Sequence, residues 1–160
     1  MKKLSLPISL NRLVEKLESK TDFSPAELLK IIKDANISEM LPALTKGGFY
    51  HAGQVCVSVQ RVFVHESIFN KVAEGLSQLA SKLIVGDQMD PRTEVGPLIL
   101  PREVDRIEQW VNEAIAAGTK LLCGGKRISD TCYQPTVLLN PPMDVKVSTS
   151  EIFGPVVSVT

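Results

Sequence analysis

The sequence predicts an α/β fold with a mainly parallel sheet and flanking helices. Two observations carry this prediction. Short β-branched runs suited to strands alternate with longer segments whose apolar residues recur at helical spacing. This alternation fills the chain from residue 59 onward and is typical of strands and helices packed in layers. The predicted strands are 59–65, 121–122, 133–139, 145–147 and 156–159, and the predicted helices are 66–82 and a segment that starts at Pro101.

The first 33 residues predict a helical segment of a different character. Apolar residues at helical spacing mark a first helix over residues 8–20. A second helix is expected to begin at Ser24, which would be its N-cap, with Glu27 as the partner in a capping box. We expect the two helices to form a hairpin that covers the core, and the alternative is an arm that docks on a partner.

Glycines and prolines divide the rest of the chain. A helix from Ile37 to Lys46 should stop at Gly47-Gly48, and residues 49–54 should form a loop. Residues 85–97 are rich in Gly, Pro and Asp and predict a long ordered loop. The helix that starts at Pro101 should end with Gly118 as its C-cap.

Composition narrows the function classes. The chain has 160 residues, 44% of them apolar, and its 18 basic and 18 acidic residues leave no net charge to attract nucleic acid or an anionic membrane. No apolar run reaches the roughly 18 residues of a membrane-spanning helix. The opening Met1-Lys2-Lys3 is followed by Pro7 and Asn11 too soon for a signal peptide, so we expect a cytoplasmic protein.

The three cysteines predict one special thiol and two bystanders. Cys56, Cys123 and Cys132 lack the C-x-x-C spacing of a zinc or redox site, and their odd number argues against a disulfide framework. Cys56 follows the Gly-containing stretch Phe49-Tyr50-His51-Ala52-Gly53-Gln54-Val55 and precedes a strand. Free backbone N–H groups at a turn there would favour the thiolate, whereas a cysteine on an apolar face is inert.

Four ordered motifs resemble the aldehyde dehydrogenase superfamily over residues 34–160. Residues 49–56 are similar to the family signature F-x-x-x-G-Q-x-C, with Arg61 following. Val85-Gly86-Asp87 with Gly96-Pro97-Leu98-Ile99 resembles a family loop, and Tyr133-Gln134-Pro135-Thr136-Val137-Leu138 resembles a later strand. Glu151-Ile152-Phe153-Gly154-Pro155 resembles the motif E-x-F-G-P. The resemblance implies a partial aldehyde dehydrogenase catalytic domain.

The resemblance also implies a reaction. Cys56 would attack an aldehyde to give a thiohemiacetal, whose hydride leaves for NAD or NADP, and water would hydrolyse the remaining thioester. Glu151 would contact the nicotinamide ribose, and Phe153 would shape the nicotinamide pocket. The family's upstream cofactor domain, its oxyanion asparagine and its general-base glutamate have no counterpart in residues 1–33, so we expect a truncated chain. A homo-oligomer that acts on a small aldehyde is the implied assembly.

Two other interpretations remain open. The chain could be an inactive remnant that serves in subunit association, because the family's other catalytic groups are not found in it. It could also be a cysteine hydrolase, since His51 lies close to Cys56 in the sequence and a Cys–His pair is a common nucleophile and base. The first predicts no hydride transfer, and the second predicts ester hydrolysis that depends on His51.

Overall fold

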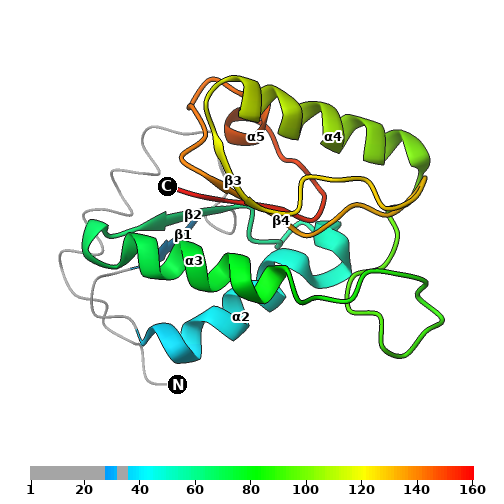
Figure 1. The fold of residues 1–160 in the computed structure, drawn as a ribbon, viewed down its shortest axis with the longest axis horizontal. Coiled ribbons are helices and arrows are strands. Elements are labelled where there is room, and N and C mark those ends of the chain that lie inside the picture. Colours follow the sequence, from blue (N-terminus) through cyan, green and yellow to red (C-terminus); the bar gives the residue numbers. More distant parts are fainter. Residues whose placement is uncertain (1–27, 32–35) are drawn as a thin grey trace, which may run out of the picture.

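The computed structural model describes residues 28–31 and 36–160, which form a five-stranded sheet with helices on both faces (Figure 1). The strands are β1 (Leu28–Ile31), β2 (Arg61–Val64), β3 (Lys120–Cys123), β4 (Thr136–Leu139) and β5 (Val156–Val159). The helices are α2 (Ile37–Phe49), α3 (Phe69–Ala80), α4 (Pro101–Ala116) and the short α5 (Lys146–Thr149), with 3₁₀ turns η2 (Tyr50–Gly53) and η3 (Glu66–Ile68).

The sheet is mainly parallel, as the sequence predicts. Its strand order is β1-β2-β5-β4-β3, and the pairs β1–β2, β2–β5 and β4–β5 are parallel while β3–β4 is antiparallel. All four residues of the central strand β5 are buried. This agrees with the rule that parallel strands covered on both faces read as continuous β-branched runs.

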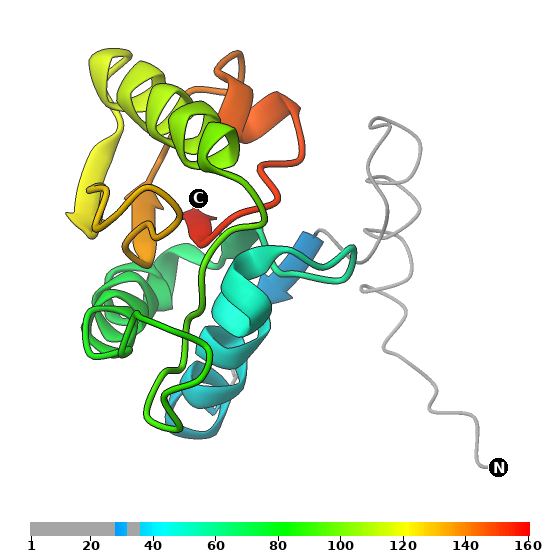
Figure 2. The ribbon, with the colours of Figure 1, turned by 90° about the vertical axis from the view of Figure 1, so that its right-hand side faces the viewer.

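Helices cover the two faces of the sheet as separate layers (Figure 2). α2 and α3 lie on one side, and α4 with α5 lies on the other. α4 buries one stripe at helical spacing, consisting of Val104, Ile107, Val111 and Ala114. It begins at Pro101, as predicted, and its C-cap is Ala117, one residue before the predicted Gly118, which follows with a left-handed φ of +99°. None of the described helices is both long and apolar enough to cross a membrane.

The prediction that Gly47-Gly48 ends a helix is wrong. α2 continues through both glycines to Phe49, because the missing side chains let the helix approach the sheet. A Cβ on Gly48 would lie 2.6 Å from Val157 Cγ2, and one on Gly47 would lie 3.2 Å from Val59 Cγ2. These glycines therefore serve close packing of helix on sheet.

Two further predicted elements differ from the structure. Leu28–Ile31 is a strand in register with Arg61–Val64 where a helix was expected, because pairing along an open sheet edge outweighs local helix propensity. Residues 145–147 were expected to form a strand, but Lys146–Thr149 makes one helical turn that buries Val147. The predicted helix at 8–20 and the start of the second at Ser24 lie outside the described residues.

Candidate functional site

Cys56 is exposed on a turn between α2 and β2. The chain leaves α2 through three consecutive left-handed residues, with φ +48° at His51, +55° at Ala52 and +70° at Gly53. A second turn follows, closed by a hydrogen bond of 3.0 Å from the Ser58 N–H to the Val55 carbonyl. This succession of turns carries the thiol to the surface, whereas Arg61 and Val62 of the strand that follows are buried.

Gly53 brings two distant motifs into contact. A Cβ at this position would lie 2.0 Å from the carbonyl oxygen of Gly154 and 2.6 Å from its carbonyl carbon. The backbone of the Cys56 turn is thus in direct contact with the backbone of the segment Glu151-Ile152-Phe153-Gly154-Pro155. Only glycine fits here, for reasons of both space and backbone conformation.

Gln54 joins a third segment to the same place. Its Nε2 donates to the Pro97 carbonyl at 3.2 Å and to the His51 carbonyl at 3.2 Å. The Ile99 N–H donates to Gln54 Oε1 at 2.9 Å. Both ends of this one amide therefore hold the loop at 97–99 against the Cys56 turn, two positions before the cysteine.

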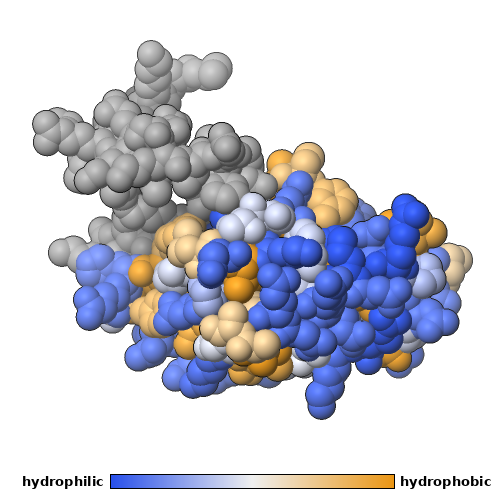
Figure 3. All heavy atoms as spheres, turned by 90° about the horizontal axis from the view of Figure 1, so that it is seen from above, coloured by the Kyte–Doolittle hydropathy of each residue, from blue (hydrophilic) through white to orange (hydrophobic). Residues whose placement is uncertain are grey.

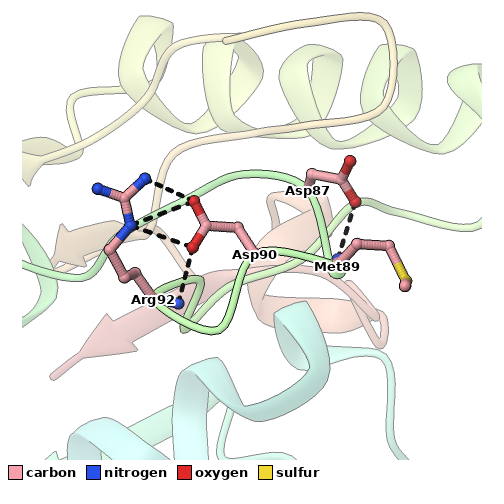
Figure 4. Close-up of polar contacts among 4 residues, drawn as sticks. All are labelled: Asp87, Met89, Asp90 and Arg92. Atoms are coloured by element: carbon pink, nitrogen blue, oxygen red, sulfur yellow. Dashed lines mark hydrogen bonds and ion pairs between the residues drawn. The ribbon is translucent and has the colours of Figure 1, made fainter.

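The segment that contributes Pro97 and Ile99 is the long loop between α3 and α4, and local contacts hold its shape (Figure 4). Asp87 Oδ1 accepts from the Met89 N–H at 2.9 Å, and the Asp90 carboxylate pairs with Arg92, with 2.7 Å between Oδ2 and Nη2. The hydrogen bonds from Arg92 hold the pKa of Asp90 below its ordinary value. The predicted ordered loop is confirmed by these bonds and by a single bridge between Val85 and Val95.

The Glu151–Pro155 segment presents Glu151 and Phe153 on either side of a buried Ile152. The Ile152 N–H donates to Gln60 Oε1 at 2.9 Å, and its carbonyl accepts from Arg106 Nη2 at 2.7 Å. Ile152 itself is only 2% exposed, whereas Glu151 is exposed and Phe153 is 39% exposed. Phe153 has a left-handed backbone, with φ +46°.

An open hollow of about 860 Å³ lies where these segments meet. Phe153 lines it together with Val55, the neighbour of Cys56, but Cys56 and Glu151 do not line it. The wall is mostly apolar with a few polar groups, which is the usual character of a site for a small organic ligand. Its lining residues are Tyr50, His51, Gln54, Val55, Gln88, Thr93, Glu94, Gly96, Pro97, Ile99 and Phe153.

The other two cysteines have surroundings unlike those of Cys56. Cys132 is buried, and Cys123 is half-buried with its Sγ 3.8 Å from the Pro135 carbonyl. Burial raises the pKa of the Cys123 thiol. Among residues 28–31 and 36–160 no group of His, Cys, Asp and Glu is arranged to hold a metal ion.

Sequence reasoning missed the residues that assemble the site. Gln54 stands inside the motif around Cys56, but its bonds to Pro97 and Ile99 could not be read from spacing. Gln60 gave one weak signal, which is a polar residue just before a β-branched strand and buried in the structure at 6% exposure. Arg106 gave none, because a charged residue on a helix is usually solvated.

Comparison with known proteins matches this fold and these motifs. The family model described as "Aldehyde dehydrogenase family" matches residues 26–160. 3-Sulfolactaldehyde dehydrogenase of Priestia aryabhattai is 42% identical over 127 residues, which are 79% of this chain and 26% of that protein. Lactaldehyde dehydrogenase of Methanocaldococcus jannaschii is 40% identical over 129 residues, 81% of this chain and 27% of that protein.

Solved structures agree. Glyceraldehyde-3-phosphate dehydrogenase of Methanocaldococcus jannaschii, complexed with NADP, superposes with a TM-score of 0.80 at 35% identity and covers 92% of this chain and 34% of its own. Betaine aldehyde dehydrogenase of Staphylococcus aureus, in complex with NAD+, gives 0.79 at 33%, covering 84% of this chain and 28% of its own. The chain thus spans about a quarter of the length of the curated relatives it matches, 26% for the first. It belongs to the aldehyde dehydrogenase family.

Proposed function

We propose that this chain carries the nucleophile and the nicotinamide-facing residues of an NAD(P)-dependent aldehyde dehydrogenase, which oxidises an aldehyde to a carboxylic acid. The observation that carries the proposal is the contact of the Cys56 turn with the Glu151–Pro155 segment through Gly53 and Gly154. An exposed thiol and an apolar hollow lined by Phe153 then lie at adjoining positions of one surface. The substrate we expect is a small aldehyde.

The residues present fit the nicotinamide half of the cofactor. The exposed Glu151 carboxylate can accept hydrogen bonds from ribose hydroxyls, and the Phe153 ring offers a flat apolar surface beside a hollow of about 860 Å³. Both solved relatives named above were crystallised with NAD+ or NADP. When bound, the nicotinamide supplies the hydride acceptor.

Cys56 would perform the covalent step. Its thiolate adds to the aldehyde carbon to form the C–S bond of a thiohemiacetal, and the carbonyl oxygen takes the negative charge. The Cys56 backbone N–H is one donor for that oxygen. Loss of hydride leaves a thioester on Cys56, and water then adds to its carbon and releases the acid and the thiol. The resemblance implies a second donor, an asparagine, which has no counterpart in residues 1–33. Loss of one oxyanion donor costs about 10²–10³ in rate, so we expect this chain alone to react slowly.

The setting of the reaction is also a proposal. Three free cysteines are consistent with a reducing compartment, and we expect the protein in the cytoplasm. A homo-oligomer is the assembly we expect, with no nucleic acid or membrane as partner.

A reaction assay tests the proposed function. The purified chain is incubated with an aldehyde and NAD+ or NADP+, and the reduced cofactor is followed by its absorbance. Acyl adducts on the protein are detected by mass spectrometry. We expect slow reduction, an adduct on Cys56, and loss of both in Cys56→Ser. Equal reduction by Cys56→Ser would contradict the proposal. If the unmodified chain gave no reduced cofactor and no adduct, the result would favour the inactive remnant.

The hydrolase alternative has its own signature. His51 is exposed, and its ring lies beside that of Tyr50 with 3.9 Å between centroids and the ring planes tilted by 58°. A hydrolase that used His51 as its base would lose ester turnover in His51→Ala. A dehydrogenase-type thiol would still be acylated in that variant.

A further inference from the structure

Gln60 bonds to the segment that holds both proposed cofactor contacts. Its side chain is 6% exposed and lies just before β2. Its Oε1 accepts from the Ile152 N–H at 2.9 Å, and its Nε2 lies 3.5 Å from Glu151 Oε1, within donating distance. One amide therefore reaches the backbone of one residue and the carboxylate of the residue before it.

Arg106 completes the hold on Ile152 from the opposite side of the peptide. Its Nη2 donates to the Ile152 carbonyl at 2.7 Å, and its Nε donates to Glu103 at 2.9 Å. The hydrogen bond from Arg106 also lowers the pKa of Glu103, as expected for a carboxylate beside a cation. Both peptide groups of Ile152 are thus bonded to side chains of other elements.

We propose that Gln60 is a positioning residue that fixes the Glu151 carboxylate and the Phe153 ring for the nicotinamide ribose of the cofactor. The inference rests on the proposed function and names the residue that prepares its cofactor side. Gln60 acts in two separable ways. Its oxygen fixes the Ile152 backbone and thereby the position of the adjoining Phe153 backbone, from which the ring extends. Its NH₂ group orients the Glu151 carboxylate.

An amide suits position 60 because a single group must both accept from the Ile152 N–H and donate to the Glu151 carboxylate. A buried Ile152 N–H without an acceptor would be costly, so an acceptor must stand there. A carboxylate at position 60 would supply that acceptor but would repel Glu151. Glutamine offers the acceptor to the backbone and the donor to the carboxylate at the same time.

Three variants of the chain separate these functions. Gln60→Leu removes both bonds, and Gln60→Glu keeps the acceptor but replaces the donor by a like charge. Gln109→Leu makes the same change as the first at an exposed position on α4 and serves as the control. Two readouts are taken by NMR: amide hydrogen exchange at Ile152, with Ser158 as reference, and the chemical-shift change of Phe153 on titration with nicotinamide mononucleotide.

Gln60→Leu should speed exchange at Ile152 about tenfold, the effect of one lost buried hydrogen bond, while Ser158 keeps its rate. The Ser158 N–H donates to the Gln60 backbone carbonyl at 2.9 Å, which no side-chain change removes. Gln60→Glu should keep the Ile152 rate but lose the response of Phe153 to the mononucleotide. Gln109→Leu should match the unmodified chain in both readouts.

Two results would overturn the inference: unchanged Ile152 exchange in Gln60→Leu, or an unchanged mononucleotide response in Gln60→Glu. If Gln60 were merely structural, Gln60→Glu would leave the mononucleotide response unchanged, because the variant keeps the side-chain oxygen that accepts from the Ile152 N–H. If the unmodified chain gave no response at Phe153, the cofactor-side part of the proposed function would fail. The role of Gln60 toward the cofactor would fail with it, and Ile152 exchange would still show whether the amide holds the backbone.

Discussion

Gly53 is the residue on which the contact between the Cys56 turn and the Glu151–Pro155 segment depends. We expect Gly53→Ala to lower the free energy of unfolding by about 2 kcal/mol or more, since it adds a clash to the strain of φ +70°. Gly118→Ala is the matched control, because Gly118 has φ +99° and no atom within 4 Å of the added Cβ. It should cost only about 1–2 kcal/mol. Urea denaturation measures both, and equal losses would contradict the packing argument.

Cys123 should resist alkylation because its pKa is raised by burial. The folded state then holds the thiol proton more tightly than the unfolded chain does. Its contribution to stability is present below the unfolded pKa and is lost as pH rises through the folded pKa. Rates of iodoacetamide labelling at Cys123 across pH should therefore rise only above the range of an ordinary thiol. A rate that follows that of a free cysteine would contradict the burial.

At the scale of elements, the glycines of α2 test how the helix packs on the sheet. Alanine is favoured over glycine in a helix by about 1 kcal/mol, so an unpacked glycine would gain stability on substitution. Gly48→Ala should instead destabilise, because its Cβ would lie 2.6 Å from Val157 Cγ2. Gly47→Ala, with 3.2 Å to Val59 Cγ2, should cost less.

Thermal unfolding ranks the two variants of α2, and Val157→Ala added to Gly48→Ala should recover part of the loss. A stabilised Gly48→Ala would show that the glycine is not packed as described. The recovery distinguishes a clash from a general loss of helix structure.

The elements that the sequence predicts correctly are those marked by their own residues. Pro101 and Gly118 delimit α4, and β-branched runs mark β2, β4 and β5, because capping and strand preference are local. The errors at Leu28–Ile31, Gly48 and 145–147 arise from contacts made elsewhere in the chain. The boundary at residue 33 between two segments stays a prediction.

The candidate site likewise has residues that the sequence marks locally and contacts that only the fold creates. Cys56 and the segment with Glu151 and Phe153 could be named from motifs, and their roles stay predictions. Their meeting point could not be named, since Gly53 contacts Gly154 across about a hundred positions of sequence. The same holds for the bonds of Gln54 to the loop at 97–99.

At the scale of the whole molecule, surface character predicts how the chain associates. The face seen from above, on the side of α4, is largely hydrophilic, with smaller hydrophobic groups between (Figure 3). Large apolar side chains are exposed near the site, among them Val57 at 67%, Ile99 at 77% and Phe153 at 39%. Exposed apolar side chains that gather on one surface favour association.

We therefore expect self-association at raised protein concentration, measured by light scattering. Ile99→Ser should weaken this association. Ile115→Ser on α4, where the isoleucine is 37% exposed, serves as the control and should leave the association unchanged. A monomer at all concentrations would contradict this prediction.

We infer that Cys56 is the working nucleophile of a site whose parts meet at Gly53. The most direct measurement is acylation by an activated ester such as p-nitrophenyl acetate, with the modified residue located by mass spectrometry of the folded chain. We predict one acetyl group on Cys56, with little on Cys123 or Cys132, and slower labelling of Cys56 in Gly53→Ala. Labelling that is no faster at Cys56 than at the other two thiols would contradict this role of Cys56.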